Sequence, residues 1–488
     1  MTYPDIESRY DQKIDEIQPL LAQYSNYDLV IGIPFRDEID HLPKMLASID
    51  QVLKSWIGRR QLIVCAGDYS AGPILDTIHL LNLQHPHIEF LMPPEISGRG
   101  MSVRAIMDIA SKLDADLILF NAHMTTDNGP GVDDAWLESL LTPIQGEYDI
   151  VLGSLRRYMG IYSIAHMMAA PILESFYGCR LGDPLGGIYA LSHDFVEELA
   201  HEARFWGKYI QGHGIDFWIL TRALCWSKRI CEINKGGAVK THSLETRNKI
   251  FYDNALTIFE ALKRDSAIWL QDRLIIKVAD ILARSEIKRP DSVNYSIDDL
   301  LRNYYSGCED NKDLCELVKS KIKLPLWEEL EQGEKFYLSD EDWITALLEL
   351  FLQYSFDENY NDQQIISLVT ALYNGRVASY SLEMEAFAEK AAVVGEAELD
   401  NLMVGKMESI RQRLTNNFWD KKADFSRQWV EHREQRKPAI IPLGYMEYVP
   451  GKPVVVPKRI AGKDQHIVQT DDIFKDLRHR YEDRKGVV

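Results

Sequence analysis

The chain has 488 residues, of which 46% are hydrophobic and 26% charged, and its formal net charge is −19 at pH 7. This length predicts two to three domains, and the hydrophobic content is ample for globular cores, which excludes a disordered or fibrous chain. A negative field repels phosphate backbones and anionic lipid, so we expect no nucleic-acid partner and no membrane surface.

The cysteines and the N-terminus indicate a cellular compartment. The six cysteines form no CxxC pair, which is typical of reduced thiols in a cytosolic protein. The first residues, MTYPDIESRYDQKIDEI, lack the apolar core of a signal peptide. The most apolar long stretch, 161–176, is interrupted by polar residues and falls short of the roughly 20 residues of a membrane span. We therefore expect a soluble, cytoplasmic protein.

Residues 1–27 are predicted to form a helix, and a different rhythm begins at residue 28. Up to about residue 155, the β-rich runs DLVIGI, QLIVCA, HIEFLM, DLILF and DIVLGS alternate with amphipathic stretches. This alternation predicts βαβ units, and therefore an α/β fold with a mostly parallel sheet and flanking helices. The carboxyl ends of the strands then share one edge, where ligands of open α/β sheets bind.

Polar residues follow three of these strands. Glu38 comes shortly after the first strand in GIPFRDE, Asp68 follows the second, and Asn121 and His123 follow the fourth. At the predicted sheet edge these side chains would reach a nucleotide or a sugar. Taken alone, each also fits a polar loop that caps the next helix.

A glycine-rich turn, SGRGMSVRAIM, opens a predicted helix with Gly98, Arg99 and Gly100. Backbone N–H groups and the positive helix end favour a diphosphate there, and Arg99 and Arg104 would add positive charge. The spacing matches neither a P-loop nor a dinucleotide fingerprint. The alternative is a plain turn at the start of a helix.

Three later motifs supply further candidates. In GDPLGG, Gly186 and Gly187 follow Asp183 and Leu185, and such glycines let the backbone pass close to a ligand or another strand.

In GHGID, His213 and Asp216 come directly before a predicted helix, where Asp216 is either an N-cap or a carboxylate that binds an acceptor. His242 ends a possible strand, and a lone histidine is more often structural than a ligand.

From about residue 251 the pattern changes to helical spacing, which predicts an all-helical domain over 251–436. The apolar positions that repeat are Leu270, Leu274, Val278, Ile281 and Leu282, and then Ile344, Leu347, Leu348 and Phe351. From residue 437 onward the chain is rich in Pro and Gly and predicts an extended arm. Because such an arm needs a surface to pack against, we expect a homo-oligomer.

In their order, these motifs resemble those of the GT-A-fold retaining glycosyltransferases, in particular the mannosylglycerate synthases and the glucosyl-3-phosphoglycerate synthases. The resemblance spans roughly residues 28–250, and DPLGG and GIDFWILTRA are its most specific motifs. It implies a Rossmann-like catalytic domain that moves a hexose from a nucleotide-diphosphate sugar to a small acceptor such as glycerate. It also implies retention of configuration without a covalent enzyme intermediate.

The resemblance further implies roles for the candidate residues. Those implied to bind the nucleotide sugar are Pro34, Phe35, Glu38, Asp68, Gly98, Arg99, Asn121 and Gly186. Those implied to act in catalysis are Asp216, Leu185 and Arg99. Those implied to bind the other parts of the substrates are Arg156, Arg157, Asp183, Gly187 and His213.

The family holds a divalent metal through a D-x-D motif and a late histidine, which correspond here to Asn121, His123 and His242. Imidazole suits Mn and Zn better than Mg, so we expect a rebuilt metal site on His123 and His242, with Asp127 in the outer shell and Mn preferred over Mg. One alternative is a nucleotide-sugar-binding protein that lost catalysis with the motif. Another is a sugar nucleotidyltransferase, although GIPFRDE lacks its glycine-rich loop. The base, the hexose and the acceptor depend on single pocket contacts.

Overall fold

The computed structural model describes residues 3–24, 27–56, 59–126, 129–156, 164–239, 244–271, 276–280, 296–325, 336–391 and 395–435. Residues 1–429 cluster into one compact unit. Within the described ranges no helix is long and apolar enough to span a bilayer. The predicted Pro-rich arm from residue 437 lies outside them.

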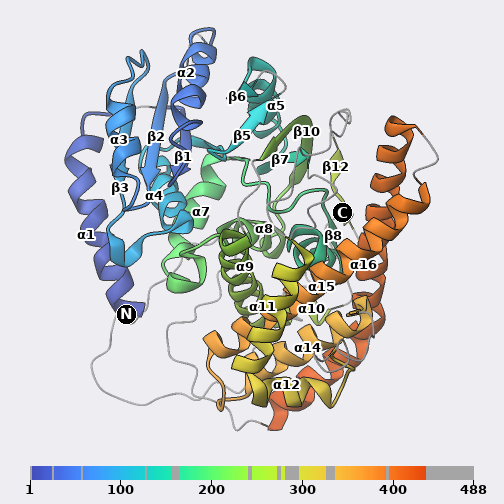
Figure 1. Ribbon diagram of the computed structural model, residues 1–488. Helices are drawn as coiled ribbons and strands as arrows, with labels where there is room; N and C mark the ends of the chain where they lie inside the picture. Colours follow the sequence, from blue (N-terminus) through green and yellow to red (C-terminus); the bar gives the residue numbers. More distant parts are fainter. Residues whose placement is uncertain are drawn as a thin grey trace, which may run out of the picture. The chain divides into compact units, whose positions relative to one another are not determined.

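The sheet confirms the α/β prediction (Figure 1). All five predicted strands form: β1 (Leu29–Phe35), β2 (Gln61–Gly67), β3 (His87–Leu91), β4 (Asp116–Leu119) and β7 (Ile150–Arg156). The first four pair in parallel in the order β3-β2-β1-β4. Every residue of β1 and β2 is buried, which explains their nearly unbroken apolar sequence.

The sheet also contains strands beyond the five β-rich runs, and one of them, β10 (Ile230–Val239), corresponds to the possible strand that was expected before His242. β9 (Tyr189–Leu191) runs antiparallel between β4 and β7, and β10 runs parallel to β7. β5 (Met124–Thr126) and β6 (Gly129–Pro130) complete the edge beyond β10. Because Tyr189, the first residue of β9, pairs with Leu119, the last residue of antiparallel β4, the DPLGG loop before β9 lies at the predicted ligand-binding edge.

Helices cover both faces of the sheet (Figure 1). Side chains of β1 alternate, with Val30 in one core and Leu29 and Ile31 in the other. The first core contains α1 (Tyr3–Leu21), α4 (Arg99–Lys112), α7 (His193–Ala203) and α8 (Ile215–Cys225). The second contains α2 (Leu42–Leu53), α3 (Gly72–His79) and α5 (Asp134–Ile144).

The predicted N-terminal helix forms as α1 and packs on α4. Arg104 of α4 is fully buried, donates to both oxygens of Glu7 at 2.7 and 2.6 Å, and lies 3.8 Å from the centre of the Tyr10 ring. The expectation that Arg104 adds charge to a ligand site is therefore wrong, because its guanidinium holds α1 instead.

The described part of the chain after residue 244 is mostly helical, as predicted from residue 251 onward. It comprises α9 (Leu244–Arg264), α10 (Ser266–Trp269), α11 (Ile297–Asp310), α12 (Lys312–Lys319), α14 (Asp340–Phe356), α15 (Asp362–Ala391) and α16 (Glu396–Gln435). The stripe from Ile344 to Phe351 lies buried on α14, as expected.

The other predicted stripe, Leu270 to Leu282, is wrong where it is described. Ile276–Lys277 forms strand β11, which pairs with β8 (Cys179–Arg180), and Ala279–Asp280 forms β12, which pairs with β10. Pairing with strands far along the chain overrides the helical spacing there.

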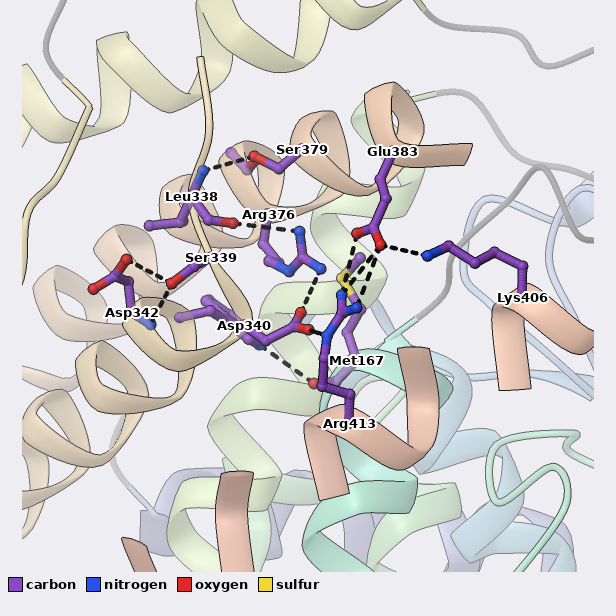
Figure 2. Close-up of polar contacts among 12 residues, drawn as sticks. Met167, Leu338, Ser339, Asp340, Asp342, Arg376, Ser379, Glu383, Lys406 and Arg413 are labelled. Atoms are coloured by element: carbon purple, nitrogen blue, oxygen red, sulfur yellow. Dashed lines mark hydrogen bonds and ion pairs between the residues drawn. The ribbon is translucent and has the colours of Figure 1, made fainter. Parts of the chain in front are cut away.

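A buried ion network ties the helical region together (Figure 2). Asp340, only 4% exposed, accepts from Arg376 and Arg413, and Arg413 also reaches Glu383 at 3.1 Å. About one helical turn further along α14, the Trp343 indole N–H donates to the carbonyl of Met167 at 3.3 Å. Met167 belongs to a short π-helix, η2 (Ala165–Ala169), so the helical region is anchored to the sheet-bearing region at this point.

Candidate active site

A cavity of about 560 Å³ lies at the carboxyl ends of β1, β2 and β4. This size is within the range of roughly 300–1,000 Å³ that is typical of small-molecule sites. The predicted site residues that line it are Pro34, Phe35, Glu38, Asp68, Gly98, Arg99, Asn121, His123, Leu185, His213 and Asp216. The fold thus brings together residues that are far apart in sequence.

One wall carries a cluster of two carboxylates and an imidazole. His123 Nε2 lies 3.4 Å from Asp37 Oδ1 and 3.2 Å from Glu38 Oε1. Glu38 Oε2 also accepts from the backbone N–H groups of Arg36 and Asp37, at 2.6 and 3.0 Å. Burial outweighs these bonds and raises the pKa of Glu38. The two bonds from the loop amides hold Glu38 Oε2, and they leave Oε1 beside the His123 ring.

This cluster fits a divalent cation. One ligand atom from each of Asp37, Glu38 and His123 lies within 4.8 Å of the others. Carboxylate oxygen together with imidazole nitrogen is a donor set suited to Mn or Zn. Asn121 is a neutral amide, and its Oδ1 accepts from the His123 N–H at 3.0 Å, which holds the turn.

The metal prediction is revised in part by this geometry. The acidic neighbours of His123 are Asp37 and Glu38, which both lie in the loop after β1. The sequence pattern did not indicate Asp37 as a metal ligand, and the resemblance implied that Glu38 binds the nucleotide sugar. His242 and Asp127 lie outside the described residues, so a role for either stays a prediction.

A buried ion pair forms the floor of the cavity. Arg99 Nη2 donates to Asp216 Oδ1 at 3.2 Å and to the Gly187 carbonyl at 3.5 Å. Burial opposes the charge of Arg99, but Asp216 outweighs burial and raises the pKa of the guanidinium. Gly187 has φ +71°, and a Cβ there would lie 2.6 Å from Arg99 Nη2. Only glycine at 187 leaves room for the pair.

The start of α4 is closed to a diphosphate. The Gln211 carbonyl accepts from the N–H groups of Gly100 and Met101, at 2.9 and 3.3 Å. The prediction that these helix-end amides bind a diphosphate is wrong, because a backbone oxygen already takes their protons. Gly98 and the Arg99 side chain still line the cavity.

The DPLGG loop lies partly beneath the cavity. Asp183 is 3% exposed, its N–H donates to Glu232 Oε1 at 3.0 Å, and it does not line the cavity. A Cβ on Gly186 would lie 2.9 Å from the Gly153 carbonyl, so Gly186 serves close packing against β7. Leu185 is the member of this loop that lines the cavity. Contact between substrate and Asp183 or Gly186 is therefore not supported.

Two further predictions concern strand ends. Asp68 lines the cavity after β2, and although burial opposes its charge, hydrogen bonds from Ser70 and Ser97 outweigh burial and lower the pKa of Asp68. Asp68 is therefore an ionised acceptor at neutral pH. Arg156 ends β7, with only its backbone described, and Arg157 lies outside the described residues.

Helix α9 forms a wall that the sequence did not reveal. It contributes Arg247, Lys249, Phe251 and Asp253, among others, and Phe251 stacks on Tyr373 of α15 with ring centres 3.9 Å apart. The helical spacing of this stretch predicts a buried face but not which part of it meets a cavity. The cavity is thus shared by the sheet edge and the helical region.

No protein-family model matches the chain, and no curated protein matches it. Among solved structures, it is similar to glucosyl-3-phosphoglycerate synthase from Mycobacterium tuberculosis in complex with Mn²⁺, UDP and phosphoglyceric acid, with 15% identity, 51% of this chain and 82% of that chain covered, and a TM-score of 0.35. It is similar to mannosyl-3-phosphoglycerate synthase from Rubrobacter xylanophilus, with 13% identity, 52% and 78% covered, and a TM-score of 0.37.

A third similar structure is S. aureus TarS 1-349 in complex with UDP, with 10% identity, 73% of this chain and 92% of that chain covered, and a TM-score of 0.34. Of the two synthase types named from the sequence motifs, glucosyl-3-phosphoglycerate synthase is among these structures, whereas the mannosyl enzyme found is a mannosyl-3-phosphoglycerate synthase rather than a mannosylglycerate synthase. Similarity at this level assigns neither substrates nor residue roles, which depend on the site itself.

Proposed function

We propose that the chain is a glycosyltransferase that moves a hexose from a nucleotide-diphosphate donor to a small acceptor. The observation that carries this proposal is the joining, in one cavity at the strand ends, of a carboxylate–imidazole cluster with a buried Arg99–Asp216 pair. Open α/β sheets bind nucleotides at this edge. Transfer from such a donor needs positive charge beside the diphosphate and a polar group beside the acceptor.

The residues divide the work by position. Asp68 at the end of β2 is the acceptor for ribose or base N–H and O–H groups. A divalent cation held by Asp37, Glu38 and His123 would offset the negative charge that grows on the leaving diphosphate. Arg99 supplies a fixed cation beside it, since Asp216 holds the guanidinium in place.

Asp216 is the residue we assign to placing the acceptor. Its Oδ1 accepts from Arg99, which leaves Oδ2 for an acceptor hydroxyl. For the acceptor itself we propose a small hydroxy acid such as glycerate, because Arg36, Arg247 and Lys249 line the same cavity and favour an anion. Retention of configuration, a cytoplasmic location and a homo-oligomeric state are part of the proposal on sequence grounds.

The test begins with UDP- and GDP-hexoses, screened for thermal stabilisation with Mn²⁺, with Mg²⁺ and with EDTA, because a bound ligand raises apparent stability. Transfer to glycerate is then followed by NMR, which also reports the anomeric configuration. Stabilisation by a donor with no transfer to any acceptor would favour a binding protein that has lost catalysis. Stabilisation by none of the donors would overturn the proposal.

Asp216→Asn provides a sharper test. We expect the variant to keep donor binding and to lose transfer by about 10²-fold or more, because it no longer holds Arg99 and the acceptor with a full charge. Asp313→Asn, on the exposed side of α12, is the matched control and should behave as wild type. Full transfer by Asp216→Asn would remove this carboxylate from the mechanism.

A further inference from the structure

His213 and Asp253 form a hydrogen-bonded dyad at the cavity. His213 Nδ1 lies 3.1 Å from Asp253 Oδ2, and the His213 backbone N–H donates to the same oxygen at 3.2 Å. A Cβ on the preceding residue, Gly212, would lie 2.2 Å from that oxygen, so glycine is needed for the approach. Because an ionised carboxylate only accepts, the proton of a neutral ring resides on Nδ1 and the lone pair on Nε2.

The His213 ring borders the cavity and keeps Nε2 available for a new hydrogen bond. Both residues line the cavity, and 24% of the His213 side chain and 19% of the Asp253 side chain are exposed. Among the described residues, His213 Nε2 has no hydrogen-bond partner and is not enclosed. His213 lies three residues before Asp216, on the same connection into α8.

The other carboxylates of the cavity are already engaged. Asp216 accepts from Arg99, and Asp68 is held by serines. Glu38 lies against His123 and two backbone amides, and Asp37 pairs with Arg36 and His123. An engaged, ionised carboxylate is a weaker base than a neutral imidazole near neutral pH. His213 is therefore better suited than these carboxylates to accept a proton, and the other imidazole of the cavity, His123, lies in the carboxylate cluster.

We propose that His213 is the general base for the acceptor hydroxyl and that Asp253 is its positioning partner; this inference rests on the proposed transferase function. The acceptor O–H proton passes to His213 Nε2 as the new bond from that oxygen to the anomeric carbon forms. The bond from the anomeric carbon to the phosphate oxygen breaks, and its electron pair leaves with the nucleoside diphosphate. Asp253 stabilises the imidazolium, which then returns its proton to solvent.

Anchoring of the loop does not by itself explain the dyad, since α9 already holds this loop elsewhere. The Thr257 hydroxyl of α9 donates to the Tyr209 carbonyl of the loop, and Gly214 packs so closely on the same residue that a Cβ there would lie 1.7 Å from Thr257 Oγ1. The loop is therefore bonded to α9 before His213 and packed closely against α9 after it, without the imidazole. The ring adds an oriented basic nitrogen, which anchoring does not require.

His213→Asn separates the two roles. The asparagine amide retains an N–H group for Asp253 but lacks the basic Nε2. With the UDP- or GDP-hexose that supports transfer to glycerate, we expect kcat to fall by about 10²- to 10⁴-fold while donor KM stays within about twofold. Imidazole added to His213→Ala should restore part of the rate. The matched control, His201→Asn on the exposed end of α7, should leave kcat unchanged.

The dyad also predicts non-additive effects. Asp253→Asn should lower kcat through His213, so the double variant His213→Asn/Asp253→Asn should be no slower than His213→Asn alone. Additive losses, an unchanged kcat in His213→Asn, or no rescue of His213→Ala by imidazole would each overturn the inference. His213→Gln provides a second variant if His213→Asn melts early. Failure of the wild type to transfer any hexose would instead overturn the proposed function.

Discussion

Replacement of Gly100 by alanine tests how closely the loop of residues 207–214 must approach the start of α4. A Cβ at Gly100 would lie 1.6 Å from the Ile210 carbonyl oxygen and 2.7 Å from that of Gly212, whereas ordinary contact begins at 3.4 Å. The Ile210 carbonyl would have to retreat by about 1.8 Å, because both partners are backbone and neither can rotate away.

The magnitude follows from what this retreat disrupts. Overpacking of this kind costs about 1–3 kcal/mol, and loss of the 2.9 Å bond from Gly100 N–H to the Gln211 carbonyl adds about 1 kcal/mol. The same loop carries His213 and leads into Asp216. A displacement of about 1 Å near reacting groups can cost about 10²-fold in rate, so we expect transfer by Gly100→Ala to fall by about that factor.

The assay is thermal melting together with steady-state transfer, and Gly405→Ala is the matched control. Gly405 lies within α16 with nothing within 4 Å of an added Cβ, so alanine there should stabilise by about 0.5–1 kcal/mol and leave transfer unchanged. A Gly100→Ala protein that melts and turns over as wild type would refute the close approach of loop and helix.

Three further predictions concern the metal cluster and stability. Glu38→Gln should weaken Mn²⁺ binding at least about tenfold in a calorimetric titration, and unchanged affinity would place the ion elsewhere. Arg376→Met should lower the free energy of unfolding in urea by about 1.5–3 kcal/mol, because buried Asp340 loses one of its two guanidinium donors and keeps only Arg413; a loss below about 1 kcal/mol would contradict this. Burial opposes the charge of Asp50, but bonds from His85 outweigh it and lower the pKa of Asp50 below 3.8. Its contribution is therefore complete above about pH 4 and lost as pH falls, so the melting deficit of Asp50→Asn should shrink toward pH 3; an equal deficit at both pH values would exclude this linkage.

The sequence predicted the elements whose pattern is long and local. β1 and β2 are seven-residue apolar runs bounded by polar turns, and the stripe on α14 keeps helical spacing over two turns. β9 has three residues, too few for a period to appear. The stripe near residue 276 failed because pairing with distant strands decides the conformation of so short a segment.

The residues of the candidate site likewise fall into a part that the sequence predicts and a part that it does not. Strand-end residues such as Asp68 were predictable because parallel strands place their carboxyl ends together. The contact between Asp37 and His123, or between His213 and Asp253, depends on which loops meet, and no spacing encodes it. The capping of α4 by the Gln211 carbonyl is a backbone contact, for which side-chain identity gives no signal.

Helix α9 gives the cavity a mechanical tie to the rest of the molecule. Phe251 and Asp253 of α9 line the cavity, and the Phe251 ring also stacks on Tyr373 of α15. A molecule that fills the cavity binds only while α9 is packed on the bundle. Its binding therefore stabilises the packed position of α9, by about 2.7 kcal/mol at a ligand concentration of about a hundred times Kd. Filling the cavity should thus make the neighbouring bundle harder for a protease to open.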